Sequence, residues 1–221
     1  MKRVRAVFFL LVPALSLPLF AQGAAPLPDE VFSRPLTAET RPRFDRVCAA
    51  LAEHRVIRGE FVQTKTLSRL GRSLVSRGTF AVDADRGMIW DTRVPYPSVM
   101  ALGGDFIIQA GGGAVSRLDA GGNETFTRIS QTMSAVFTGN ARKLTEAFEV
   151  YFSESGGGWK LGLLPKDSSI RAFARAIVIQ GDSVLRRMLL LEQSGDSILY
   201  ELSNHAYSPA LSADEASLFK P

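Results

Sequence analysis

Residues 59–97 alternate between apolar and polar side chains over two long segments, and this period of two constrains the fold more than any other feature. Successive side chains on a β-strand point to opposite faces of a sheet, so the run predicts a long hairpin with one apolar face. No recognisable catalytic residue lies within it. Strands are expected from residue 56 onward and at 74–83, 87–93, 98–102, 106–110, 115–119, 148–153, 158–164, 174–180, 184–193 and 197–204, separated by turns that contain Gly or Asp.

Two regions have a helical period instead. Residues 41–53 place apolar side chains on one stripe, with Thr40 as the expected N-cap. Residues 128–147 form a second region, in which Gly139 ends one helix and a short helix over 140–147 follows. The two stripes comprise Phe44, Val47, Cys48 and Leu51, and Ile129, Met133, Val136 and Phe137.

Many short strands interrupted by two helical regions predict an α+β fold. We expect a large curved antiparallel sheet, an unclosed β half-barrel, with helices covering its concave face. The chain contains no linker composition and no internal repeat, so residues 24–221 are expected to form one domain.

The first 23 residues are typical of a secretory signal peptide. Lys2, Arg3 and Arg5 precede an apolar run at 6–20, and the small residues Ala21 and Gly23 follow at the minus-three and minus-one positions of a plausible cleavage site. The run spans about 15 residues and contains two prolines, whereas a membrane-spanning helix needs roughly 20 apolar residues. We therefore expect export to the periplasm, with cleavage near Gly23 or Ala25.

Composition argues against several classes of function. Much of the formal net charge of +4 belongs to the signal peptide, so nucleic-acid binding is not indicated. Cys48, the only cysteine, is expected to be a buried, inert thiol. His54 and His205 match no metal-ligand spacing and are expected to be hydrogen-bonded or exposed to solvent. No nucleotide, hydrolase or metalloprotease motif is present, so we expect neither an enzyme nor a bound cofactor or metal.

The apolar and aromatic content of the early strands and of the second helical stripe is the remaining signal. In one interpretation these side chains simply form the core. In the other, helices over an incompletely filled half-barrel leave an apolar cavity whose Met and aromatic walls accept variable acyl chains. The candidate lipid-binding residues are Phe61, Phe80, Met88, Trp90, Met100, Phe106, Ile129, Met133, Val136 and Phe137.

Several motifs, in this order along the chain, resemble the LolA-type periplasmic lipoprotein carriers. They are "GEFVQTK" from Gly59, "SRGTF" from Ser76, "GMIWDTRVPYPSVM" from Gly87, "WKLGLLPKDSS" from Trp159 and the late hairpin "LLLEQSGDSILYELSN". The first hairpin, "FVQTKTLSRLGRSLVSRG", is similar to a divergent LolA-like branch in which this hairpin is longer and more basic.

The resemblance implies an unclosed β-barrel whose covered concave face holds lipoprotein acyl chains. It implies cargo transfer from an inner-membrane ABC-type release complex to an outer-membrane receptor, by a chain that we expect to be monomeric. Phe61, Met88 and Trp90 match apolar positions of the family's early strands, and 129–137 matches its lid helix. Ala84 replaces the arginine that latches the lid in better-known carriers, and Arg86, two residues later, is the candidate substitute.

Two alternatives remain open at this stage. The same fold could carry a glycolipid or another acyl lipid, because the first hairpin and the latch position diverge from the better-known carriers. The chain could also be a non-catalytic periplasmic sensor or protein-interaction module whose apolar face binds a protein.

Overall fold

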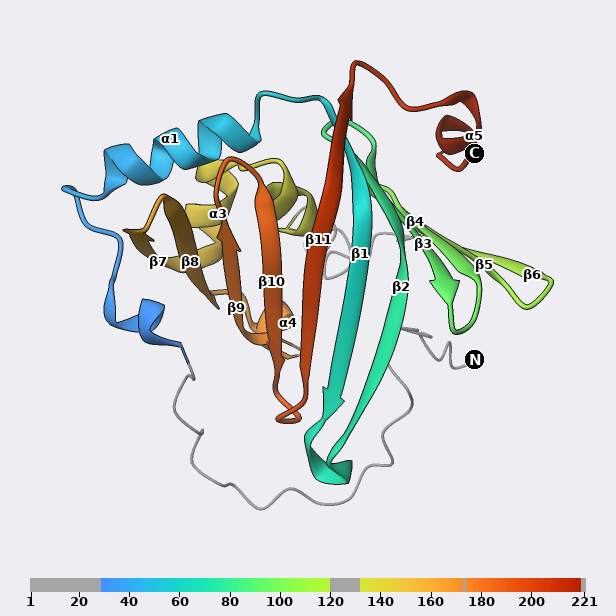
Figure 1. Ribbon diagram of the computed structural model, residues 1–221, viewed down its shortest axis with the longest axis horizontal. Coiled ribbons are helices and arrows are strands. Elements are labelled where there is room, and N and C mark those ends of the chain that lie inside the picture. The colour runs from blue at the N-terminus through green and yellow to red at the C-terminus, as the bar shows by residue number, and fades with distance from the viewer. Residues whose placement is uncertain (1–28, 120–131, 173, 220–221) are drawn as a thin grey trace.

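The protein is described from a computed structural model that covers residues 29–119, 132–172 and 174–219. The expected signal peptide, and Ile129 of the second helical stripe, lie outside the described residues. One antiparallel sheet of eleven strands dominates the described part of the chain (Figure 1). Its strands are β1 (Val56–Leu67), β2 (Arg72–Asp83), β3 (Gly87–Val94), β4 (Ser98–Leu102), β5 (Phe106–Gly111), β6 (Ala114–Asp119), β7 (Phe148–Ser155), β8 (Gly158–Pro165), β9 (Ala174–Gly181), β10 (Leu185–Glu192) and β11 (Ser197–Ser208).

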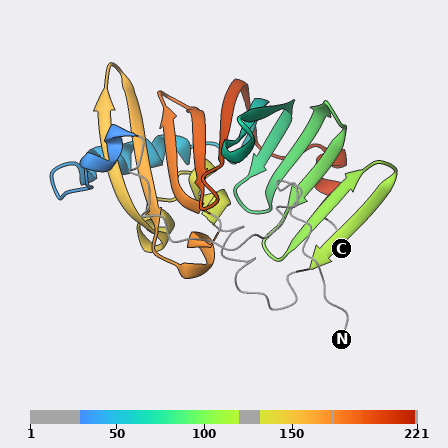
Figure 2. The same ribbon diagram turned by 90° about the horizontal axis from the view of Figure 1, so that it is seen from below.

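The strand order is β6-β5-β4-β3-β2-β1-β11-β10-β9-β8-β7. Two meanders of consecutive hairpins therefore meet at one seam, where β1 pairs with β11 in a register that runs from Val56↔Ser208 to Thr66↔Ser197. Figure 2 shows the β5–β6 and β7–β8 hairpins at opposite ends of the sheet. The sheet does not close, which confirms the predicted half-barrel.

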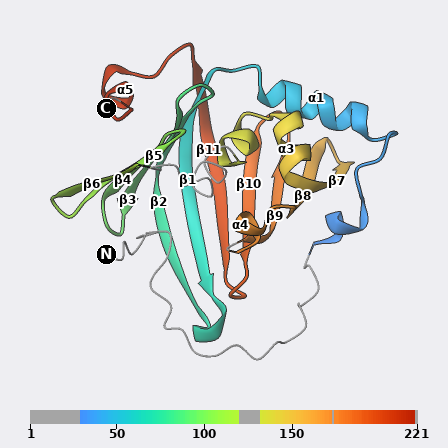
Figure 3. The same cartoon turned by 180° about the vertical axis from the view of Figure 1, so that it is seen from behind.

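The helices are short. They are α1 (Arg41–Leu51), a helical segment at residues 132–137, α3 (Ala141–Ala147), α4 (Ser168–Arg171) and α5 (Ala213–Ser217), with 3-10 turns η1 (Glu30–Ser33) and η2 (Ser68–Leu70). Figure 3 shows α1 and α3 on one side of β7–β10. Their buried side chains share one core with the concave face of the sheet. None of the described helices is long and apolar enough to cross a membrane.

Helix α1 forms as its apolar spacing predicts, because Phe44, Cys48 and Leu51 are all buried on one stripe. Thr40 occupies the N-cap position, as predicted. Thr40 has helical backbone angles, and its side chain makes no capping hydrogen bond. Its Oγ1 instead accepts a hydrogen bond from the Thr37 backbone N–H at 3.0 Å. Burial raises the pKa of the Cys48 thiol to about 12, which fits the expected inert cysteine.

Helix α5 packs on the opposite, convex face. Leu218 and Phe219 contact a small cluster formed by Ala81, Ile89 and Ala101. A charged clamp holds this C-terminal arm: Arg58 Nε donates to Glu215 Oε1 at 2.9 Å, and Arg58 Nη2 donates to the Ala210 carbonyl at 3.2 Å. The helices thus divide between two faces, and the larger share covers the concave one.

Candidate functional site

Four aromatic side chains from three neighbouring strands and β11 form a continuous apolar surface on the concave face. The Trp90 ring stacks on Phe61 with centroids 4.5 Å apart and on Phe80 at 5.8 Å, and it meets Tyr200 edge-on at 5.2 Å. The register explains the grouping, because Phe80 lies opposite Trp90 in the β2–β3 pair and strand alternation keeps their side chains on one face. We call Phe61, Phe80, Trp90 and Tyr200 the aromatic floor.

The helical segment at 132–137 covers this floor with Phe137. That ring lies 6.0 Å from Phe80 and 6.1 Å from Trp90 between centroids, and both Val136 and Phe137 are buried. The segment ends at Gly139, whose φ of +59° and contact with α1 leave no room for a side chain: an added Cβ would lie 2.4 Å from the Cys48 carbonyl oxygen. The space between the floor and this segment is therefore filled by Phe137.

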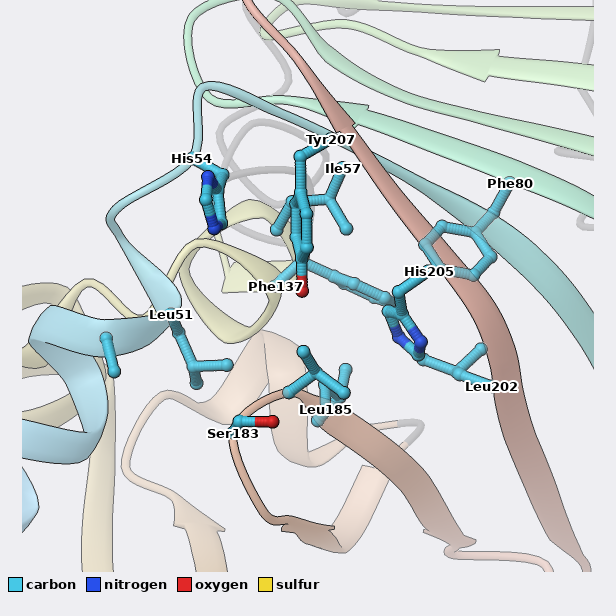
Figure 4. Close-up of a pocket in the computed structure, with 12 residues that line it drawn as sticks. Leu51, His54, Ile57, Phe80, Phe137, Ser183, Leu185, Leu202, His205 and Tyr207 are labelled. Carbon is cyan, nitrogen blue, oxygen red and sulfur yellow. The ribbon is translucent and has the colours of Figure 1, made fainter.

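A small pocket remains beside Phe137, at the end of α1 (Figure 4). Its volume is about 20 Å³, which is room for a water molecule but not for an acyl chain. Apolar side chains, two histidines, Ser183 and Tyr207 surround it: Ala50, Leu51, His54, Ile57, Phe80, Phe137, Ser183, Val184, Leu185, Leu202, His205 and Tyr207. Beneath Phe137 the concave face is packed, and a larger pocket of about 360 Å³ lies between Thr132, α3 and α4.

His205 reaches this pocket because of a β-bulge. The β1–β11 register shifts between Arg58↔Ala206 and Glu60↔Ser203, and Asn204 takes a left-handed φ of 52°. The bulge brings His205 onto the same face as Leu202, against the edge of the Phe80 ring at 5.9 Å. Burial and, less strongly, the charge of Arg186 lower the pKa of its imidazole.

The structure corrects one expectation for the histidines. Both ring nitrogens of His205 are buried and make no hydrogen bond of good geometry within the described part of the chain, although the Leu185 backbone lies close enough to stabilise the protonated ring; this imidazole is therefore not solvent-facing. His54 stacks on Tyr207 with ring centroids 3.8 Å apart. Together the two histidines and Tyr207 give the pocket a polar margin.

A buried ion pair lies on the same concave face. Lys65 Nζ lies 3.1 Å from Glu192 Oε1, and the two side chains are 6% and 10% exposed. Lys65 is in phase with Phe61 along β1 and therefore points to the concave side, where it contacts Glu192. Burial and, secondarily, the Glu192 charge raise the pKa of the Tyr200 phenol, which stays neutral.

The indole N–H of Trp90 is a second polar feature of the aromatic floor. Trp90 is 7% exposed, and among residues 29–119, 132–172 and 174–219 no acceptor hydrogen-bonds its Nε1. A buried donor without an acceptor costs about 1–3 kcal/mol. A carbonyl oxygen brought to this position would remove that cost.

Comparison with models of protein families places this chain in a known family. A sequence profile described as "Outer membrane lipoprotein carrier protein LolA" matches residues 52–220, which is most of the chain. The chain belongs to the LolA family. Comparison with curated proteins finds no significant match.

Solved structures overlap this chain at low sequence identity. A domain of an outer membrane lipoprotein-sorting protein from Vibrio parahaemolyticus is 11% identical, with 83% of this chain and 100% of that chain covered and a TM-score of 0.44. A LolA superfamily protein from Nitrosomonas europaea is 9% identical, covering 80% and 96%, with a TM-score of 0.45. LprF from Mycobacterium bovis is 12% identical, covering 81% and 97%, with a TM-score of 0.38. The family assignment itself depends on the sequence profile.

Most of the side chains expected to bind lipid in this LolA family member lie together. One core contains Phe61, Phe80, Met88, Trp90, Val136 and Phe137, and Met100 and Met133 are partly buried against it. The structure therefore groups eight of the expected residues on or over the concave face.

Phe106 is placed differently. Its ring meets Phe219 at 6.3 Å, and the Arg117 guanidinium lies 4.2 Å from its centroid. It is in phase with Ile108, which packs with the convex cluster that α5 covers. Phe106 thus lies on the other side of the sheet from the aromatic floor, and we remove it from the candidate lipid-binding set.

The proposed latch residue, Arg86, lies in the exposed turn between β2 and β3. Its backbone N–H donates to Asp83 Oδ1 at 3.2 Å, as does that of Asp85 at 2.9 Å, which is the turn role expected of Asp83. No ion pair within the described residues involves the Arg86 guanidinium, so nothing there joins it to the segment at 132–137.

Sequence reasoning missed the polar members of the concave face. Lys65 was visible in phase with Phe61, but its partner is 127 residues away along the chain. His205 lies beyond a bulge that reverses the strand alternation. The described residues contain no group of three or more His, Cys, Asp or Glu side chains placed to hold a metal ion.

Proposed function

We propose that this chain is a periplasmic carrier that shields the acyl chains of lipoproteins between its concave sheet face and the helical segment covering it. In this proposal it moves lipoproteins from the inner to the outer membrane. Membership of the LolA family supports the proposal, as does the single apolar face that combines the aromatic floor with the helical cover.

The observation that carries the proposal is Phe137 on the aromatic floor. Burial is worth about 0.8 kcal/mol per methylene, so an acyl chain of about 15 methylenes costs roughly 12 kcal/mol to expose to water. A carrier must match that burial without leaving an open apolar cavity when empty. Phe137 fills the face in the unloaded protein, and loading exchanges one apolar filler for another.

The polar groups of the face suit the polar end of an acyl chain. An ester or amide carbonyl beside the aromatic floor could accept the hydrogen bond that Trp90 Nε1 lacks among the described residues. The Lys65–Glu192 pair lies on the same face. We propose that Trp90 fixes the depth to which cargo enters, while the surrounding apolar side chains hold its hydrocarbon.

Partners are inferred from the family. The sequence contains no nucleotide-binding motif, so the energy for loading must come from another protein. We propose an inner-membrane ABC-type complex as the donor and an outer-membrane receptor as the acceptor. Export by the signal peptide at residues 1–23 would place the carrier between them.

Native mass spectrometry of the protein purified from the periplasm tests the cargo. A lipoprotein bound to the wild type, and lost from a Phe61→Glu variant, is the expected result. A bound glycolipid or free acyl lipid would instead favour a different cargo on the same fold. The absence of any lipid, together with capture of a specific protein by the same face, would favour an interaction module.

Depletion in cells tests the transport step separately. We expect lipoproteins to accumulate at the inner membrane when the protein is depleted. An unchanged distribution of lipoproteins between the two membranes would contradict the lipoprotein version of the proposal. A Val115→Ser variant, changed at an exposed position on β6, serves as the complementation control.

A further inference from the structure

The hairpin of β1 and β2 extends beyond the other strands at one end of the molecule (Figures 1 and 3). The ladder continues to Leu67↔Arg72, and the 3-10 turn η2 and Gly71, at φ +56°, close it. The neighbouring β10–β11 turn braces this tip: the Ser68 N–H donates to Asp196 Oδ1 at 2.9 Å, and the Ser68 hydroxyl bonds the Gly195 carbonyl. We call residues 67–77 the basic tip.

The basic tip exposes large apolar side chains to solvent. Leu70 is 66% exposed, Leu74 47% and Val75 40%. The β3–β4 turn, which follows the Arg77↔Val94 pair at the inner end of this segment, carries Tyr96, which is 82% exposed. Exposed apolar side chains gathered at one protruding end indicate an interaction surface. The surface is a projection with no groove. A projection can insert into a lipid bilayer, whereas binding a protein segment would require a groove that encloses it.

The charge of the same hairpin has one sign. Residues 61–82 contain Lys65, Arg69, Arg72 and Arg77 and no Asp or Glu. Lys65 is paired with Glu192, but none of the ion pairs formed within residues 29–119, 132–172 and 174–219 includes the three arginines of the tip. Asp196 is the acidic neighbour, and one of its oxygens is bonded to the Ser68 N–H. The tip therefore presents unneutralised positive charge around its leucines.

We propose that the basic tip docks this protein on a bilayer containing anionic phospholipid. Leu70 and Leu74 enter the headgroup region, and Arg69, Arg72 and Arg77 bind lipid phosphates. Arginines beside short apolar insertions are the combination that anchors peripheral proteins to anionic membranes. The anionic bilayer supplies the negative charge that neutralises these arginines.

The strand geometry links this tip to the concave face. Leu74 is in phase with Phe80 along β2, so both side chains lie on the concave side of the sheet. An acyl chain that left a membrane at the tip would meet the face that carries the aromatic floor. This link rests on the proposed carrier function, whereas docking itself can be measured without cargo.

Vesicle flotation of the full-length exported protein tests docking. We expect binding to vesicles of phosphatidylethanolamine and phosphatidylglycerol, weakening with added salt, and little binding to phosphatidylcholine alone. Each tip arginine changed to Gln should weaken binding roughly five-fold. The pair Leu70→Ser and Leu74→Ser should weaken it by on the order of ten-fold or more.

Matched controls separate the tip from general surface effects. Val115→Ser removes an equally exposed aliphatic side chain from β6, and Arg46→Gln removes an exposed arginine from α1. Neither should change vesicle binding. Leu70→Trp gives a second measurement: its fluorescence, after subtraction of the wild-type signal from the buried Trp90 and Trp159, should shift to the blue with anionic vesicles.

Two results would overturn the proposal. One is the absence of flotation with anionic vesicles at low salt. The other is vesicle binding that is the same in the tip variants as in the wild type, which is the result expected if the protein attaches through a different surface. Native mass spectrometry keeps the two proposals apart: a Leu70→Ser, Leu74→Ser protein that retains cargo but no longer docks supports both, whereas a wild type that docks without any cargo would count against the carrier function alone.

Discussion

At the scale of single residues, the Lys65–Glu192 pair shows how a charged group is kept on an apolar face. Taking both charges out of water carries a large desolvation penalty, which their mutual attraction offsets only while both are present. The pair joins β1 to β10 across β11, because Lys65 lies opposite Ile198, and Ile198 lies opposite Leu190. It therefore fastens the two meanders of the sheet near their seam.

Removing one partner of this pair should be costly. We expect Lys65→Met to lower the free energy of unfolding by about 3 kcal/mol, because Glu192 is left buried without its cation. The double variant Lys65→Met, Glu192→Leu should recover most of that loss. Urea denaturation measures both. Arg187→Met, which breaks an exposed pair with Glu201 at 3.8 Å, is the control and should change stability by less than about 0.5 kcal/mol. Equal effects of the two single changes would contradict the assignment.

His205 should make stability depend on pH. Burial, followed by the charge of Arg186, lowers the pKa of the folded imidazole below its ordinary value of 6.5, although the Leu185 backbone and then the charge of Asp182 act in the opposite direction. The unfolded chain then takes up the proton more readily than the folded one. Stability is therefore lost as the pH falls from about 6.5 toward the lowered folded pKa.

Urea midpoints measured at about pH 7.5 and about pH 5.5 test this expectation. The midpoint should fall more in the wild type than in His205→Gln. His54 is unchanged in both proteins, so its contribution cancels in the comparison. Identical pH profiles would show that His205 is not the group responsible.

Which face a residue occupies was predictable only where one side of a strand is polar. Phe61 lies between Glu60 and the polar second half of β1, and it reaches the concave face as expected. Strand β5 begins with three apolar residues, Phe106, Ile107 and Ile108, so its sequence does not say which of them point to the concave face. Pairing with β4 decides it, since Ile107 lies opposite Leu102 and Ile108 lies opposite Ala101.

At the scale of elements, the strands were predictable and the helix ends were less so. Period-two alternation between Gly and Asp turns located each strand to within a few residues, because a half-buried sheet requires that pattern. Helices of four or five residues such as α4 and α5 have too few turns to show a period. Thr40 is the N-cap residue but makes no side-chain cap, because its hydroxyl accepts a hydrogen bond from the nearby Thr37 N–H.

Gly139 controls how the covering segment meets α1. In Gly139→Ala the new Cβ would contact the Cys48 carbonyl oxygen and the Leu51 side chain, at a backbone φ that disfavours Ala. We expect a loss of about 2 kcal/mol or more in the free energy of unfolding. Gly104→Ala, where an added Cβ meets no atom within 4 Å, should be nearly neutral. Thermal unfolding compares the two, and equal melting temperatures would contradict the close contact.

At the scale of the whole molecule, Phe137 and cargo should compete for the aromatic floor. Phe137→Ala should destabilise the protein by about 3 kcal/mol, as a buried Phe truncation does. The same change should tighten binding of a fluorescent fatty acid by about ten-fold or more, because the ligand no longer displaces the ring. An equilibrium titration measures the affinity. Val136→Ala is the matched control, because Val136 is the buried neighbour of Phe137 and places no ring on the aromatic floor.

A packed core with no carrier role would give the same loss of stability but no gain in fatty-acid affinity. Phe137→Ala would then be destabilised and would bind the fatty acid no better than the control. Trp90 emission provides a second signal, measured in a Trp159→Phe background. Trp159 lies apart from the floor on β8, where its Nε1 donates to the Asp182 carbonyl at 2.5 Å.

The seam between β1 and β11 has a consequence for how the chain reaches its native state. Each meander is made of hairpins between neighbouring strands, which form from contacts close in sequence. The seam joins Val56 to Ser208, so it can form only after β11 has been synthesised, and closing so long a loop is entropically slow. Until then β1 and β11 are both open edges. A folding factor that protects such edges would speed maturation without touching the finished protein.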